Sequence, residues 1–176
     1  GEEHQRRSPV DDSSLLPWTE AAPDVFDPLL GQLRTLNLRA EADLTARSAA
    51  LLQLATDLER DAALLARLIT MENGCPNAQS EALQVQSAVA LIRSLVSQAS
   101  EFAFTEVRSG ARGGKVRIDR LPIGIALGIV PCNVPIFLAC LKLATALLAG
   151  CPVVLKPSPE NVDSMACFSR YLARMD

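Results

Sequence analysis

Residues 121–155 form a long, almost uncharged stretch in which Lys142 is the only charged residue. A stretch of this length and polarity could be mistaken for a membrane span. Proline, glycine and asparagine interrupt it repeatedly, and they divide it into pieces of strand and helix length. This pattern is typical of buried strands and a helix in an α/β core. We therefore expect an α/β fold and no membrane partner.

The last third of the chain predicts the first βαβα of a Rossmann-like doubly wound parallel sheet, which is incomplete. The apolar runs are those expected for parallel strands that are covered on both faces. The predicted elements are a strand at Ile123–Val130, a helix at Ile136–Ala149, a strand at Cys151–Leu155 and a helix at Asn161–Met175. Ligands bind at the carboxyl ends of the strands in such sheets. The loops at residues 131–135 and 156–161 are therefore the candidate site.

The rest of the chain predicts three further segments before the start of the nucleotide-binding domain at residues 123–176. Residues 1–28 are polar and lack periodicity, so we expect a disordered lead, with Asp27-Pro28 as a helix start. Residues 29–100 predict a helical layer, which Gly74 divides. Its helices are expected at Leu29–Met71, with a joint near residues 59–61, and at Ala78–Ser100. Residues 101–122 predict a β-hairpin with strands at Phe102–Val107 and Lys115–Leu121.

Composition excludes several classes of function. The net charge is −3 and basic residues are scattered, which argues against a nucleic-acid partner. The five cysteines form no CxxC pair and the chain has one histidine, so we expect no metal site. An odd number of cysteines in mostly apolar surroundings is typical of reduced thiols in a cytoplasmic protein. The N-terminus is charged and polar, and it shows no signal-peptide pattern.

The segment PIGIALGIVPCNVPIFLACLKLATALLAGCPVVLKPS, residues 122–158, resembles the opening of the nucleotide-binding domain of an aldehyde dehydrogenase. That family typically shows Pro-Trp-Asn-x-Pro after a strand, an apolar helix with a lysine, and then Val-Val-Leu-Lys-Pro-Ser. The order and spacing match here. Upstream, ERDAALLARLITMENGCP resembles the end of a family helix. The resemblance covers roughly residues 45–175.

The resemblance implies that two residues act in catalysis. The family's motif asparagine, here Asn133, donates its side-chain amide to the oxyanion that forms when a cysteine thiolate attacks the aldehyde. Without the resemblance, the favoured interpretation of Asn133 is a turn residue that makes local hydrogen bonds. Lys142 matches a lysine that helps to organise the family's site. A lysine on an apolar helix otherwise needs a partner or a path to solvent.

The aldehyde pocket is expected around the same turn and helix. Its candidate residues are Cys132, Val134, Phe137, Leu138 and Leu141. For the helix residues, a simple core role remains an alternative. Cys132 replaces the family's tryptophan, which reshapes the pocket. Cys132 could itself be a nucleophile, but no base stands near it in sequence.

The resemblance also implies a nicotinamide cofactor, either NADP or NAD. The expected binding residues are Ile129, Val130, Pro131, Lys156 and Ser158. At Pro159 the NAD-preferring members usually carry a glutamate that binds the ribose hydroxyls and repels a 2′-phosphate. Its absence slightly favours NADP, although Glu160, one residue later, could compensate in part.

The leading hypothesis is the N-terminal part of an NAD(P)-dependent enzyme that oxidises an aldehyde to a carboxylic acid through a cysteine thiohemiacetal. The family's nucleophilic cysteine, general base and glycine-rich turn follow this region, and none of the five cysteines aligns with that nucleophile. We therefore expect a homo-oligomer or a complementing C-terminal chain. One alternative is a truncated, non-catalytic module for binding or oligomerisation. Another is a small enzyme with a non-redox chemistry built on Asn133 and Cys132.

Overall fold

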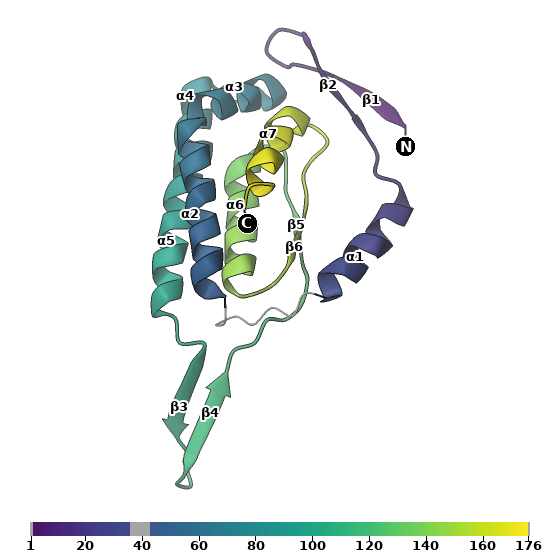
Figure 1. Ribbon diagram of the computed structural model, residues 1–176. Coiled ribbons are helices and arrows are strands. Elements are labelled where there is room, and N and C mark those ends of the chain that lie inside the picture. Colours follow the sequence, from purple (N-terminus) through teal and green to yellow (C-terminus); the bar gives the residue numbers. More distant parts are fainter. Residues whose placement is uncertain (1, 36–42, 176) are drawn as a thin grey trace.

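A computed structural model describes residues 2–35 and 43–175 (Figure 1). The helical elements are η1 (Pro23–Val25), α1 (Phe26–Thr35), α2 (Leu44–Arg60), α3 (Ala62–Asn73), α4 (Asn77–Gln79), η2 (Ser80–Gln86), α5 (Ser87–Glu101), α6 (Pro135–Leu148) and α7 (Val162–Leu172). The strands are β1 (Glu3–Arg7), β2 (Ser14–Thr19), β3 (Thr105–Ser109), β4 (Lys115–Asp119), β5 (Ala126–Ile129) and β6 (Val153–Lys156). They form three separate two-stranded sheets.

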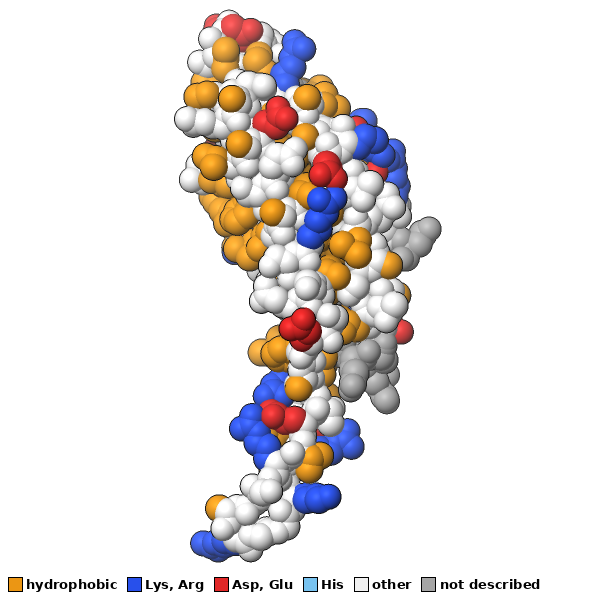
Figure 2. Space-filling view, turned by 90° about the vertical axis from the view of Figure 1, so that its left-hand side faces the viewer, with side chains coloured by type: hydrophobic (Ala, Val, Ile, Leu, Met, Phe, Trp, Pro, Cys, Tyr) orange, Lys and Arg blue, Asp and Glu red, His pale blue; other side chains and the backbone are white. Residues whose placement is uncertain are grey.

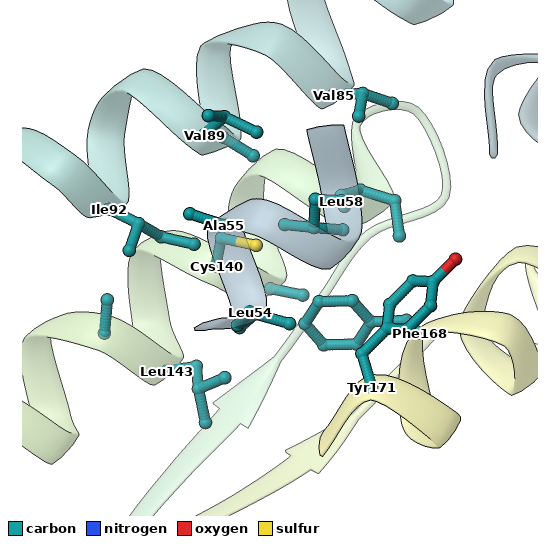
Figure 3. Close-up of a cluster of buried hydrophobic side chains, with 14 of the residues drawn as sticks. Leu54, Ala55, Leu58, Val85, Val89, Ile92, Cys140, Leu143, Phe168 and Tyr171 are labelled. Atoms are coloured by element: carbon teal, nitrogen blue, oxygen red, sulfur yellow. The ribbon is translucent and has the colours of Figure 1, made fainter. Parts of the chain in front are cut away.

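The core lies where α2, α5, α6 and α7 pack together (Figures 1 and 3). Leucines recur on α2 at the spacing of one helix face, and Leu51, Leu54 and Leu58 are fully buried. Figure 3 shows Leu54 and Leu58 close to Phe168 of α7, with Cys140 of α6 beside Ala55. The helical layer therefore supports the helix α6 that begins at the candidate site.

The βαβα unit has the predicted parallel topology. Strand β5 pairs with β6 in register from Ala126 with Val153 to Ile129 with Lys156, and α6 connects the two strands. A Cβ atom on Gly128 would lie 2.7 Å from Cδ2 of Leu155 and 3.3 Å from Cβ of Lys142. Glycine at this position is thus what lets β6 and α6 approach β5 closely. The α/β fold class is as predicted.

One part of the β5 segment is apolar and open to solvent. Ile123 is 95% exposed, and the side chains of Leu127 and Ile129 are also largely exposed. Exposed apolar groups gathered on a strand mark a surface that another element or another chain covers. The expectation of a homo-oligomer or a complementing C-terminal chain was made from the sequence; this surface agrees with it, and it stays a prediction.

Strands β3 and β4 form an antiparallel hairpin that projects from the helices (Figures 1 and 2). Charged side chains gather on it in Figure 2, and Glu106 binds Arg108 and Arg120. Strand β3 begins three residues later than predicted, because Phe102 ends α5 and packs edge-on against Phe104. The predicted hairpin is present with shorter strands.

The N-terminal lead differs from its prediction. Residues 1–28 were expected to be disordered, but β1 and β2 pair as an antiparallel hairpin beside α7. The turn between them lies beside the end of α3, where a Cβ atom on Gly74 would lie 3.6 Å from Cγ of Pro9. The sequence does not predict this hairpin, because the contacts that order it come from distant residues and it has no core of its own.

The predicted helices differ from the structure in detail, although the joint near residues 59–61 is as predicted. Helix α1 begins at Phe26 after the short η1, one residue before the predicted cap at Asp27. The predicted helix at Leu29–Met71 is broken at the expected joint, where α2 ends at Arg60 and α3 begins at Ala62. The part of that prediction at residues 36–42 lies outside the described residues. The helix predicted at Ala78–Ser100 contains the π-helical segment η2. Within residues 2–35 and 43–175, no helix is long and apolar enough to cross a membrane.

Asp61 lies at the joint between α2 and α3 and ties it to α7. Arg60 donates to its carboxylate at 3.0 and 2.8 Å, and Tyr171 Oη donates at 2.8 Å. The hydrogen bonds from Arg60, aided by the one from Tyr171, lower the pKa of Asp61 from 3.8 to about 2. Because the folded pKa is the lower one, the stabilisation is complete above pH 4 or so and is lost as the pH falls toward 2.

We expect Asp61→Asn to lower the free energy of unfolding by about 1 kcal/mol at neutral pH, since the pair is partly screened by solvent. Near pH 2 the substitution should have a smaller effect, because Asp61 is then largely protonated in the unfolded state and about half protonated in the folded state. Urea unfolding at the two pH values measures the difference. Asp24→Asn, which changes an exposed acid in η1, is the control. A difference that does not depend on pH would contradict this assignment.

Candidate functional site

The two predicted loops meet at the carboxyl ends of β5 and β6. Ile129 and Lys156 are register partners at the ends of the strands, and Val130 N donates to Lys156 O at 3.0 Å. Val130 is buried, while Ile129 and Pro131 are exposed beside it. The predicted cofactor residues Ile129, Val130, Pro131 and Lys156 are therefore neighbours. The edge they form is the one at which doubly wound sheets bind ligands.

The first loop delivers Asn133 to the start of α6. Pro135 occupies the first turn of that helix and Val134 is its N-cap residue, so the amide groups of the first turn follow directly after Asn133. Asn133 is exposed, and its side-chain amide makes no hydrogen bond to the described residues. The amide is thus available as a donor next to the positive end of a helix dipole.

The helical layer holds this loop by side chains that sequence reasoning missed. Asn73 Nδ2 donates to the carbonyl oxygen of Cys132 at 3.0 Å and lies 3.4 Å from that of Asn133. Gln84 Nε2 donates to the carbonyl oxygen of Asn133 at 3.3 Å. Asn73 lies inside the MENGCP segment that resembles the end of a family helix, and this resemblance is the sequence feature that points to it. Nothing in the sequence marks Gln84, because its position depends on the π-helical turn.

The predicted pocket residues divide into two groups. Phe137 and Leu138 are half-buried and pack against the core cluster, as the core alternative expects. Cys132, Val134 and Leu141 are half-buried outside that cluster. Cys140 of α6 is fully buried, and burial raises the pKa of its thiol, so it is not a ready nucleophile.

Lys142 lies near the middle of α6, about 10 Å along the axis from the start of the helix. Its aliphatic stem crosses Gly128 of β5, and its side chain lines a cavity of about 340 Å³ together with Thr145 and Cys151. The stem is thus packed while the ammonium group reaches the surface. The structure places Lys142 on the sheet side of α6 and does not join it to Asn133 by any contact among the described residues.

The second loop, after β6, carries Lys156, Ser158 and Glu160. Lys156 is exposed and its Nζ donates to Pro157 O at 3.3 Å. Ser158 Oγ donates to the carboxylate of Glu160, and this hydrogen bond is the main cause of the lowered pKa of Glu160. A carboxylate, a hydroxyl and an ammonium group are therefore close together. Groups of these types bind and discriminate sugar hydroxyls and phosphates.

A buried ionic network joins the helix that follows the second loop, α7, to α3 and β1. Glu72, the penultimate residue of α3, accepts hydrogen bonds from the backbone amides of Asp163 at 2.6 Å and Ser164 at 3.3 Å, and from the Ser164 hydroxyl. Glu72 thereby caps the N-terminus of α7 with a negative charge. Arg6 of β1 bridges Glu72 at 3.1 Å and Asp163 at 3.0 Å. Sequence reasoning missed this network because it placed Arg6 in a disordered lead.

The family profile of the aldehyde dehydrogenases matches residues 33–176. The chain belongs to the aldehyde dehydrogenase family. A geranial dehydrogenase from Castellaniella defragrans is 35% identical over 123 residues, which are 70% of this chain and 26% of that enzyme. A probable aldehyde dehydrogenase from Streptomyces coelicolor is 30% identical over 175 residues, 94% of this chain and 32% of that protein. This chain thus spans about a quarter to a third of the length of those relatives.

Solved structures of the family have the same fold. A putative aldehyde dehydrogenase from Burkholderia cenocepacia is 27% identical with a TM-score of 0.86, and the match covers 99% of this chain and 36% of that one. An aldehyde dehydrogenase from Mycobacterium tuberculosis complexed with NAD⁺ is 26% identical with a TM-score of 0.88, over 99% of this chain and 36% of that one. This chain therefore matches about a third of each solved structure.

Proposed function

We propose that this chain supplies the oxyanion donor and the adenosine-side cofactor loop of an NAD(P)-dependent aldehyde dehydrogenase. The substrate class is an aldehyde, which is oxidised to a carboxylic acid. In this proposal the chain is the N-terminal part of the working enzyme, and the nucleophilic cysteine and general base come from residues outside it. The exposed apolar surface at Ile123 and Leu127 is where the remaining sheet, or a second chain, packs.

The observation that carries this proposal is the placement of Asn133. Its side-chain amide is exposed and unpaired among the described residues, and it stands at the start of α6, where the backbone amides of the first turn are also free to donate. Attack on an aldehyde carbonyl places negative charge on its oxygen. A fixed donor aimed at that oxygen stabilises the transition state by about 2.7–4 kcal/mol. Asn133 would therefore act on the reacting oxygen itself.

The cofactor loop fits the adenosine half of a dinucleotide. Ser158 offers a hydroxyl and Lys156 a cation at the end of β6, and Ile129, Val130 and Pro131 would contact the cofactor from the end of β5. The bound cofactor supplies the hydride acceptor of the reaction. The carboxylate of Glu160 is held by Ser158, so it would exchange this hydrogen bond for one from a ribose hydroxyl.

The half-buried residues of α6 and its preceding turn form one wall of the proposed aldehyde pocket. These residues are Cys132, Val134, Phe137, Leu138 and Leu141. In the same proposal, Lys142 holds the positive charge that organises the site from the sheet side of α6. Its anchoring across Gly128 limits the directions in which the ammonium group can point.

We expect the full-length protein to use NADP at least as well as NAD. Pro159 carries no charge that would repel a 2′-phosphate, and Lys156 offers a cation at the same strand end. The initial rates of aldehyde oxidation with each cofactor measure the preference. Pro159→Glu should move the preference toward NAD, whereas Val10→Glu, at an exposed position in the N-terminal hairpin, should leave it unchanged. A hundredfold preference of the unaltered protein for NAD would contradict the expectation.

A further inference from the structure

The backbone carbonyl groups of Cys132 and Asn133 point toward the helical layer and are bound there. Asn73 Nδ2 lies 3.0 Å from the carbonyl oxygen of Cys132, and Gln84 Nε2 lies 3.3 Å from that of Asn133. Both donors are side-chain amides from segments at least 49 residues away in the sequence. The loop that carries Asn133 is therefore fixed by two tertiary hydrogen bonds as well as by its own turn.

The orientation of the Asn73 amide follows from its other hydrogen bond. Asn73 Oδ1 accepts from the backbone amide of Cys75 at 3.0 Å, so its NH₂ group faces the Cys132 carbonyl. Asn73 is the last residue of α3, and Gly74 follows in the left-handed conformation with φ 76°. The helix end thus holds Asn73 in a defined place, and its amide group has one chemically reasonable orientation.

Gln84 is unusual because it is a buried amide that is only half satisfied. Its residue is 2% exposed, and Oε1 is buried without a partner among the described residues. An unsatisfied buried acceptor costs about 1–3 kcal/mol. Gln84 lies in the π-helical segment η2, and such segments are frequent at functional sites. An apolar side chain would avoid that cost, so stability alone does not explain a glutamine at this position. The hydrogen bond from Gln84 to the carbonyl oxygen of Asn133 is the feature that explains it.

We propose that Gln84 and Asn73 are positioning residues that hold Asn133 in the orientation needed to bind the oxyanion, an inference that rests on the proposed function. Rotation of the peptide groups before or after Asn133 would break one or both of these hydrogen bonds. A donor that is already aligned needs no reorganisation in the transition state, whereas a mobile one must be ordered at that moment. Gln84 and Asn73 touch neither substrate nor cofactor and act through Asn133.

The first experiment replaces Gln84 by methionine in the full-length protein. Methionine has a similar length and no donor, so the loop loses one restraint while the core stays filled. We expect kcat for aldehyde oxidation to fall roughly tenfold, while KM for aldehyde and for cofactor changes less than about twofold. Gln86→Met, at an exposed position of the same segment, is the matched control and should leave kcat unchanged. Equal kcat values for the two variants would overturn the proposal.

A second variant, Gln84→Glu, separates orientation from packing. At neutral pH its carboxylate would face the carbonyl oxygen of Asn133 and repel it. As the pH falls and the carboxylic acid forms, its O–H can donate to that oxygen again. We expect kcat of this variant, relative to that of the unaltered protein, to recover severalfold as the pH falls through the pKa of the new carboxyl group. A ratio that does not change with pH would count against a positioning role.

A double-mutant cycle decides whether Gln84 acts through Asn133. In an Asn133→Ala background there is no amide to orient, so Gln84→Met should lower kcat less than about twofold further. The same roughly tenfold loss in both backgrounds would show a general structural role and overturn the inference. Absence of aldehyde-dependent turnover in the unaltered protein would overturn the proposed function together with it. A loss of turnover in Asn133→Ala without any in Gln84→Met would overturn this inference alone.

Discussion

Asn133→Ala is expected to lower the kcat of the full-length protein for aldehyde oxidation by about a hundredfold or more. The substitution removes an exposed amide donor that is held beside the start of α6. Loss of one such donor from an oxyanion site costs about 2.7–4 kcal/mol in the transition state. In the proposal, Lys156, Ser158 and the end of β5 contact the cofactor and Asn133 does not, so cofactor affinity should change much less. Steady-state rates with saturating cofactor and a fluorescence titration of cofactor binding measure the two effects.

The matched control for Asn133 is Asn77→Ala. Asn77 is also exposed and is the first residue of the helix α4, but it lies outside the two loops of the candidate site. We expect this variant to retain its kcat. If Asn133→Ala retained its kcat as well, Asn133 would be a turn residue and the oxyanion role would be wrong.

Arg6→Ala is expected to cause the largest loss of stability, about 3–5 kcal/mol. The Arg6 side chain is 9% exposed, that of Glu72 is fully buried, and Arg6 also pairs with Asp163. Removing the cation leaves two carboxylates close together without compensation. Burial raises the pKa of Glu72, and Arg6 opposes this effect. In the variant, Glu72 should therefore take up a proton more readily, and the loss of stability should shrink as the pH falls.

Chemical denaturation of Arg6→Ala and Arg7→Ala measures this effect with a control from the adjacent residue. Arg7 pairs with Asp12 on the surface, where an ion pair contributes about 0–1 kcal/mol. The double variant Arg6→Ala/Glu72→Gln should recover part of the lost stability, because it also removes the uncompensated charge. Equal effects of Arg6→Ala and Arg7→Ala would show that the network does not fasten the N-terminal hairpin.

The parts of the fold that were predicted correctly are those in which the hydrophobic pattern agrees with the prolines and glycines that end each element. The apolar runs at residues 123–130, 136–149 and 151–155, separated by the turn at residues 131–135 and by Gly150, predicted the βαβ unit. Gly74 predicted the end of α3, and its φ of 76° is the conformation that glycine favours there. Both kinds of signal are short-range, so they can be read without knowing which distant segments pack together.

The parts that were not predicted depend on long-range contacts. Strand β1 is polar and β2 is the short segment SLLPWT, and neither strand has a buried residue, so no core pattern marks them. Arg6 of β1 reaches Glu72 and Asp163 and so joins the hairpin to distant segments. The π-helical turn that places Gln84 against the Asn133 loop has no sequence signature. At the candidate site, the turn and its asparagine were predicted, while the side chains that hold the turn were not. Which distant side chains meet is set by tertiary packing, and one sequence does not encode it in a local pattern.

The most direct test of the proposed function is the stoichiometry of a single reaction by the full-length protein. Aldehyde, oxidised cofactor and water should yield equal amounts of carboxylic acid and reduced cofactor, with two protons released at neutral pH. We predict that reduced cofactor appears only when aldehyde is present, and that its formation slows about a hundredfold or more in Asn133→Ala. Absence of reduced cofactor with a broad panel of aldehydes, from a folded protein that contains this chain, would contradict the account.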